Sequence, residues 1–189
     1  SSLVIRPEYP RLKSLDDAKD KIIFVETEQG IGDQFLFGSM LKSLKKVAKK
    51  VIFASEPRLV DIFSRSVEGL VVGPVIAEKK YGNIYHHYPE LKKKIHEMDL
   101  RPDYHIPLAS LTSLFWTSSE GVNSTEFDFA KADSDTWKDF KERLAPYEGK
   151  VKIGIAWASE LTKGDRKQYY LDYKVFDAQP PCFVQCVEQ

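Results

Sequence analysis

The residues best suited to chemistry lie in a short turn with two glycines and one aspartate. The turn reads Glu28-Gln29-Gly30-Ile31-Gly32-Asp33 and separates an apolar run from a helical pattern. Glycine lets a ligand approach the backbone closely, and a helix that starts here presents free N–H groups and a partial positive charge. Asp33 can act as a general base toward an acceptor hydroxyl, or it can cap the helix. The residue types alone leave both roles open.

The spacing of this turn excludes two common nucleotide sites. Gly-Ile-Gly-Asp lacks the third glycine of the G-x-G-x-x-G dinucleotide fingerprint and the Lys-Ser/Thr pair of a P-loop. We therefore expect neither NAD binding nor P-loop chemistry at this position.

Short apolar runs alternate with helical patterns around the turn. A buried strand is predicted over 21–26 and an amphipathic helix from Asp33 to Lys50. Further strands are predicted over 51–54, 70–76 and 104–108, and further helices after Pro57 and over 89–99, 109–116 and 137–144. This alternation predicts a Rossmann-like α/β fold with a parallel sheet, in which ligands bind at the carboxyl ends of the strands.

The apolar side chains expected to face the core are Phe37, Leu41, Leu44 and Ala48 in the first helix, Leu91, Ile95 and Met98 in 89–99, and Trp137, Phe140 and Leu144 in 137–144. The tyrosines around His86 and His87 are interpreted as a surface loop or as part of an acceptor groove, and 117–133 as a polar loop.

The domain organisation is uneven along the chain. Residues 1–20 are expected to form an amino-terminal arm or linker, and 21–150 a Rossmann-like domain. Residues 151–189 contain only two strand patterns, beginning with 151–157, and such a sheet is too small to bury its own faces. We therefore expect 151–189 to be the start of a second Rossmann-like domain in a longer protein.

Composition limits the function classes. The 28 basic and 28 acidic side chains cancel, which argues against a nucleic-acid-binding protein. No apolar run approaches the roughly 20 residues of a membrane helix, and no signal peptide is recognisable. Cys182 and Cys186 are interpreted as small buried hydrophobes in a reducing compartment, so a cytoplasmic protein is expected. His86 and His87 would point to opposite faces of a strand, so no metal site is expected.

Four segments, in order, resemble the glycosyltransferase-like domains that follow tetratricopeptide repeats in many bacterial proteins. They are residues 28–41, 56–59, 104–111 and 153–157. Those domains are similar to the heptosyltransferase family. The resemblance implies a GT-B architecture, with 21–150 as the acceptor-side domain and 151–189 as the start of the donor-side domain. It also implies a tetratricopeptide region in the same polypeptide.

The resemblance also implies roles for individual residues. Asp33 matches the proposed catalytic base of the heptosyltransferases. His105 matches a strand end where it could line the cleft, although a histidine satisfied at a sheet edge is the alternative. The implied substrate-binding residues are Gln29, Gly30, Ile31, Gly32, Gln34 and His105. Arginine often follows the strand-end tryptophan in the tetratricopeptide-linked family, but Ala158 stands here, so Ser159, Lys163 and Arg166 become the candidates for the donor phosphates.

The implied activity is transfer of a sugar from a UDP- or ADP-sugar to a hydroxyl of a glycan, lipid-linked or protein acceptor. No bound cofactor or metal is implied. Since the donor-side domain is incomplete, we expect the 189-residue chain alone to be inactive. The alternative is a non-catalytic binding or scaffold module derived from the GT-B fold, which Ala158 favours. A flavodoxin-like signalling domain would need an acidic cluster at the strand ends, which the sequence does not contain.

Overall fold

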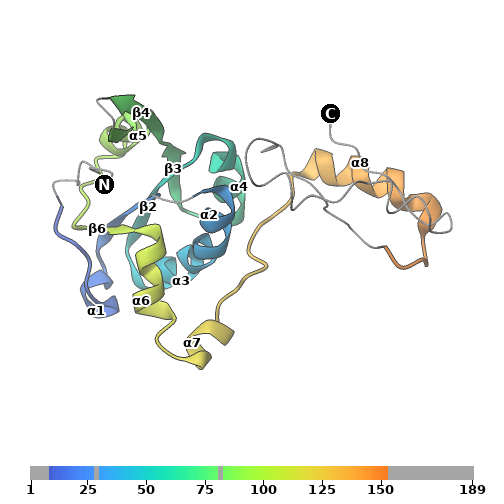
Figure 1. Ribbon diagram of the computed structural model, residues 1–189, viewed down its shortest axis with the longest axis horizontal. Helices are drawn as coiled ribbons and strands as arrows, with labels where there is room; N and C mark the ends of the chain where they lie inside the picture. The colour runs from blue at the N-terminus through green and yellow to red at the C-terminus, as the bar shows by residue number, and fades with distance from the viewer. Residues whose placement is uncertain (1–8, 28–29, 81–82, 153–189) are drawn as a thin grey trace. The chain divides into compact units, whose positions relative to one another are not determined.

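A computed structural model describes residues 9–27, 30–80 and 83–152 of the chain (Figure 1). The chain divides into two compact units, residues 1–140 and 141–189.

A four-stranded sheet with all neighbouring strands parallel forms the centre of the first unit. Its strands are β1 (Ile22–Glu26), β2 (Lys50–Ser55), β3 (Val71–Pro74) and β6 (Tyr104–Pro107), in the order β3-β2-β1-β6. The chain runs outward from β1 to β3 and then returns to the far side of β1. The predicted Rossmann-like α/β fold is confirmed.

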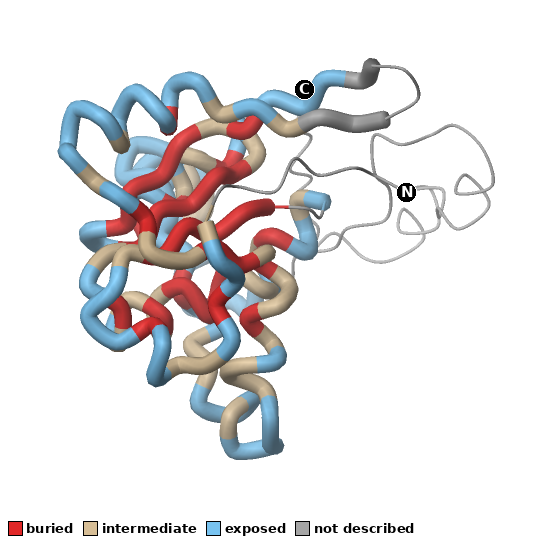
Figure 2. The backbone as a smooth tube through the Cα atoms, turned by 90° about the vertical axis from the view of Figure 1, so that its left-hand side faces the viewer, coloured by how far each residue is buried: buried red, intermediate tan, exposed pale blue. Residues whose placement is uncertain are grey.

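Helices cover both faces of this sheet. Alternate residues of one strand contribute to two different cores, because side chains on a strand point to opposite faces. Ile23 and Val25 join a large core with the helices of one face, while Phe24 joins a smaller core with Leu91 on the other. The large core contains residues of α2 (Ile31–Gly38), α3 (Met40–Val47), η1 (Pro57–Leu59), α4 (Val60–Ser66) and η2 (Leu108–Leu111). Leu91 comes from α5 (Pro89–Glu97). The central strands are buried because helices cover both faces, and Figure 2 marks these buried residues in red.

The single helix predicted from Asp33 to Lys50 is wrong. The structure has two helices there, α2 and α3, that meet at Ser39, and Lys50 already belongs to β2. The Ser39 hydroxyl donates to the Leu36 carbonyl at 2.6 Å. A serine that bonds its own helix backbone in this way competes with the regular ladder and bends the helix.

A β-hairpin stands where the sequence suggested a surface loop with tyrosines. Strands β4 (Ile76–Lys80) and β5 (Asn83–His87) pair antiparallel and form a separate two-stranded sheet. The hairpin leads into α5, which packs closely on β3. A Cβ atom on Gly73 would lie 2.8 Å from the Cβ of Leu91, so this approach of helix and strand requires glycine. Met98, predicted to point inward, is 48% exposed.

Residues 9–20, part of the predicted arm, pack on the edge of the sheet. Arg11 forms a parallel bridge with His105. The amide of Leu12 donates to the carbonyl of His105 at 2.8 Å, and that of His105 to the carbonyl of Pro10 at 2.9 Å. Helix α1 (Leu15–Ala18) follows, and both Leu12 and Ala18 are buried. This segment therefore extends the sheet beyond β6.

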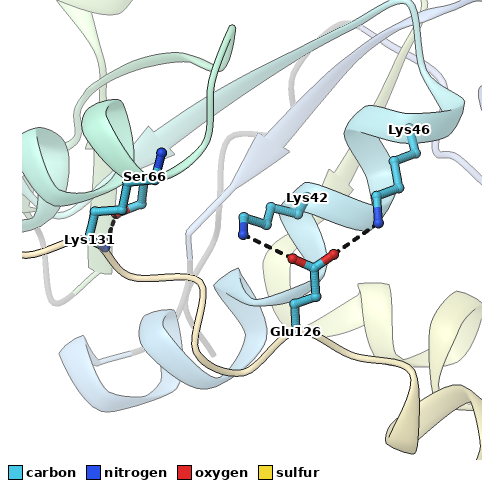
Figure 3. Close-up of polar contacts among 5 residues, drawn as sticks. All are labelled: Lys42, Lys46, Ser66, Glu126 and Lys131. Atoms are coloured by element: carbon cyan, nitrogen blue, oxygen red, sulfur yellow. Dashed lines mark hydrogen bonds and ion pairs between the residues drawn. The ribbon is translucent and has the colours of Figure 1, made fainter.

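A strap of residues 124–131 crosses helices α3 and α4 after the short helices α6 (Thr112–Phe115) and α7 (Ser119–Asn123). It was predicted as part of a polar loop, yet Phe129 is 2% exposed and stacks on Phe63 with ring centroids 5.7 Å apart. Glu126 accepts from Lys42 and Lys46 of α3, at 2.9 Å each (Figure 3). The amide of Lys131 donates to the hydroxyl of Ser66 on α4 at 2.8 Å.

The two lysines make the strap sensitive to acid. Their hydrogen bonds, and then their charges, lower the pKa of Glu126 from 4.5 to about 2. Because this pKa is lowered by folding, the contribution of Glu126 to stability is complete above pH 4.5 and is lost as the pH falls through about 2. Carboxyl-carbon NMR should therefore follow a Glu126 midpoint well below 4.5, and the midpoint should return toward 4.5 in Lys42→Met/Lys46→Met. A wild-type midpoint at 4.5 would show that the ion pairs do not form in solution.

Helix α8 (Ser134–Leu144) and the 3-10 helix η3 (Ala145–Tyr147) follow the strap. The helix was predicted from the stripe of Trp137, Phe140 and Leu144, but Trp137 is 62% exposed. Of the strand predicted over 151–157, only residues 151 and 152 are described, and they lie in no strand. Among the described residues, no helix has the length and apolar character needed to span a membrane.

Candidate functional site

The glycine turn lies at the carboxyl end of the central strand β1. The strand order reverses at β1, because β2 and β3 lie on one side of it in the sheet and β6 lies on the other. In open α/β sheets such a reversal opens the crevice in which ligands bind. Helix α2 starts on one side of the crevice with Gly30 as its N-cap, and η2 starts on the other and packs on α2.

Asp33 is the third residue of α2 and is exposed. The N-cap is Gly30, so the interpretation of Asp33 as the cap itself is wrong. Its carboxylate turns back toward the start of the helix, since a Cβ atom on Gly30 would lie 3.6 Å from Asp33 Oδ2. An acidic group in a first turn is favoured by the helix dipole. The exposed carboxylate stays accessible to a partner in solvent.

Gln34 is buried and ties the start of α2 to the end of β2. Its Oε1 accepts from the hydroxyl of Ser55 at 3.2 Å and from the amide of Glu56 at 3.1 Å. The sequence predicted Gln34 as a substrate-binding residue. The structure shows that it also has a structural role, because it joins α2 to the segment at the end of β2.

A pocket of about 390 Å³ opens beside Gln34. It is lined from the ends of the parallel strands and from the hairpin, by Thr27, Gln34, Glu56, Pro57, Val75, Ile76, Ala77 and His86. The hairpin supplies one wall, since Ala77 and His86 are paired across β4 and β5. The pocket thus combines residues far apart in the sequence at the edge of the sheet where ligands are expected.

Three polar side chains of the lining, those of Thr27, Glu56 and His86, differ in hydrogen bonding and in protonation. Thr27 is 5% exposed, and its Oγ1 has no hydrogen-bond partner among the described residues. Both carboxylate oxygens of Glu56 are engaged by Arg58, one by its Nε at 2.7 Å and one by its amide at 2.8 Å. Burial, and secondarily the neighbouring His87, lowers the pKa of His86. His86 is therefore uncharged at neutral pH and able to both donate and accept hydrogen bonds.

A buried pair of titratable side chains lies on the α5 side of the same sheet edge. Glu26 and His105 are 8% and 7% exposed, and the distance from His105 Nδ1 to Glu26 Oε1 is 3.4 Å. That distance is longer than that of a well-formed hydrogen bond. Burial, then Glu26, then Tyr9 raises the pKa of Tyr88 to about 12. The sequence singled out His105 for substrate binding but not Glu26, and neither residue lines the pocket.

The predicted site residues thus fall into three groups. Gly30, Ile31, Gly32 and Asp33 form the turn and first residues of α2, Gln34 reaches the pocket, and His105 pairs with Glu26. Gly32 faces open space, because a Cβ atom there would meet no atom within 4 Å. Gln29, Ser159, Lys163 and Arg166 lie outside the described residues, as do Ala158, Cys182 and Cys186.

The described parts of the chain contain no group of three or more His, Cys, Asp or Glu side chains placed to hold a metal ion. His87, the neighbour of His86, lies 3.3 Å from Glu78 through its Nε2. Nothing in the residue order indicated that Thr27, Glu56 and His86 share one pocket, because only the parallel sheet and the missed hairpin bring them together.

Comparisons with protein-family models, with curated proteins and with solved structures find no match to this chain.

Proposed function

We propose that the first unit is the acceptor-side half of a glycosyltransferase that uses a nucleotide-sugar donor. The observation that carries this proposal is the composition of one sheet edge. The glycine turn, the exposed Asp33 and the pocket all lie at the carboxyl edge of the parallel sheet. The resemblance of the turn to the heptosyltransferases supplies the reaction class. Asp33 is the proposed base for the acceptor hydroxyl, and a UDP- or ADP-sugar is the proposed donor.

The exposure of Asp33 suits this role. A general base must come within hydrogen-bond reach of the hydroxyl that it deprotonates, and the Asp33 carboxylate is exposed in the first turn of α2. Glu56, the carboxylate that does line the pocket, is engaged by Arg58 through both oxygens. Of these two groups Asp33 is therefore the better base.

Asp33→Asn should reduce donor-dependent sugar transfer on the order of a hundredfold in the full-length protein, because it removes the proton acceptor and keeps the shape of the side chain. The measurement is release of nucleoside diphosphate with UDP- and ADP-sugars and a panel of acceptors. Asp61→Asn is the matched control, since Asp61 is also an exposed aspartate in the first turn of a helix, α4. Equal turnover in Asp33→Asn and Asp61→Asn would remove Asp33 from the mechanism.

A non-catalytic binding module is the second candidate. The observation that favours it is that Asp33 does not line the pocket, so a ligand can be bound there without meeting a base. Calorimetric titration of the full-length protein with UDP- and ADP-sugars separates the two functions. The absence of binding heat with either donor supports the module, and donor binding supports the enzyme.

A further inference from the structure

One residue of the pocket lining carries a buried polar atom for which the described protein provides no hydrogen-bond partner. Thr27 Oγ1 is buried, and it belongs to a residue that lines the pocket. A buried hydroxyl left unpaired is costly, and a group in the pocket that bonds to it removes that cost. Since a hydroxyl both donates and accepts, its natural partner is another group of the same kind.

The charges around the pocket argue against an ionic ligand. Among the described residues that line it there is no Lys or Arg, and Arg58 is engaged by Glu56. A phosphate or carboxylate in the pocket would face the Glu56 carboxylate without a cation from the lining. The hairpin adds no charge at neutral pH through His86, whose pKa is lowered, while His87 beside it is paired with Glu78.

The rest of the lining is apolar. Pro57, Val75, Ile76 and Ala77 surround the polar groups, and Ile76 is 49% exposed at the start of the hairpin. The volume of about 390 Å³ lies within the range of small-molecule sites. A sugar ring combines C–H faces, which pack on apolar walls, with hydroxyl groups at its edge, which bond to a hydroxyl and an imidazole.

We infer that this pocket binds one uncharged sugar ring, held between the Thr27 hydroxyl at the end of β1 and the His86 imidazole on β5. The inference rests on the proposed function in one respect, namely that the ring belongs to the acceptor. Such a pocket favours a neutral glycan over a phosphorylated lipid headgroup or an acidic peptide. The hairpin then becomes the element that selects the acceptor, because it supplies both His86 and part of the apolar wall.

The test uses the 189-residue chain and the methyl glycosides of glucose, galactose and N-acetylglucosamine, with glucose 6-phosphate and glucuronate as charged analogues. Binding is measured by saturation-transfer NMR and by titration of backbone amide shifts. We expect at least one neutral glycoside to bind with a dissociation constant on the order of 1 mM, and its charged analogue at least about tenfold more weakly. Thr27→Val and His86→Val should each weaken the neutral ligand by about five- to tenfold.

Two controls separate binding from folding. Thr27→Val keeps the shape of the side chain and removes a hydroxyl with no described partner, so its melting temperature should not fall. His87→Val changes the neighbouring residue of β5, which does not line the pocket, and should bind as wild type. The inference is overturned if glucose 6-phosphate binds as tightly as the neutral glycoside, if both pocket variants bind as wild type, or if no neutral glycoside binds up to about 50 mM.

A failure of this inference can be told apart from a failure of the proposed function, because the assay measures sugar binding and not sugar transfer. Neutral glycosides that bind through Thr27 and His86, together with a full-length protein that transfers no sugar, would reject the enzyme and keep the pocket. Transfer that needs Asp33 and is unchanged by Thr27→Val and His86→Val would reject the pocket and keep the enzyme.

Discussion

Replacing Phe63 with alanine should lower the free energy of unfolding by about 3–5 kcal/mol, the range for removal of a fully buried aromatic ring. Phe63 is fully buried on α4 and contacts three other rings. Its ring centroid lies 5.0 Å from that of Phe53, 5.7 Å from Phe129 and 6.1 Å from Phe35. One ring therefore joins the sheet, α2 and the strap. Surrounding atoms will fill the resulting cavity only in part, because four separate segments would have to move together.

Urea denaturation followed by circular dichroism measures this effect, with the midpoint expected to fall and the slope to stay unchanged. Phe127→Ala is the matched control, since Phe127 also belongs to the strap and is 49% exposed. It should cost less than about 1 kcal/mol. A similar loss in both variants would mean that the strap and α4 do not pack as described. The result matters for the site because α2, which carries the glycine turn, is held by the same cluster of rings.

The central sheet could be predicted because its strands are short, apolar and bounded by clear turns. Ile22 to Glu26 and Tyr104 to Pro107 form strands close to the expected limits. The hairpin could not be predicted in the same way. Strand β4 contains Glu78, Lys79 and Lys80, and its partner β5 pairs with it in a separate sheet, so the hairpin lacks the run of apolar residues typical of a strand in a core.

The break at Ser39 shows a second limit of periodicity. The stripe of Leu41, Leu44 and Ala48 is correct, and all three are buried. The pattern continues across Ser39 because its side chain is also buried, so period alone does not reveal that one helix ends there and the next begins. Helix breaks made by a serine hydroxyl depend on its rotamer, which the residue order does not determine.

The candidate site was predictable where one continuous segment forms it. The turn from Gly30 to Gln34 stands out by glycine spacing and by its place after a strand. The pocket joins Thr27, Glu56 and His86, which only strand order brings together. Glu26 was missed for a different reason: a glutamate that ends an apolar run is usually solvated, and here the far face of the sheet, with Tyr88 nearby, removes it from water.

The burial of Glu26 beside His105 leads to a second prediction of a large loss in stability. Glu26→Leu and His105→Leu should each lower the free energy of unfolding by about 3 kcal/mol, because removal of one member of a buried polar pair leaves the other in a medium that solvates it poorly. Both side chains are about one-tenth exposed, at 10% and 9%, so solvent screens their interaction little. The double variant should lose less than the sum of the two, since it takes both polar groups out of the interior at once.

A double-mutant cycle in urea measures this coupling, which we expect to be about 1–3 kcal/mol. Lys21 and Asp103 provide the matched pair, because they also link the β1 and β6 segments but are 48% and 38% exposed with 3.9 Å between their charged atoms. Exposed pairs of this kind contribute less than about 1 kcal/mol. Additive losses at Glu26 and His105, equal to those of the exposed pair, would show that the contact at the end of β1 does not exist in solution.

Tyr88 offers a readout of the same pair that does not depend on unfolding. Its pKa of about 12 has burial as the first cause and the Glu26 carboxylate as the second. Glu26→Leu should therefore lower this pKa but leave it above 10.0, the value of an unperturbed tyrosine. The folded value exceeds the unfolded one, so the neutral phenol stabilises the fold below pH 10 and this contribution is lost as the pH rises toward 12. An NMR titration of Tyr88 that is identical in wild type and Glu26→Leu would place the carboxylate away from the ring, and the buried pair would then have no electrostatic connection to the segment that leads from the hairpin into α5.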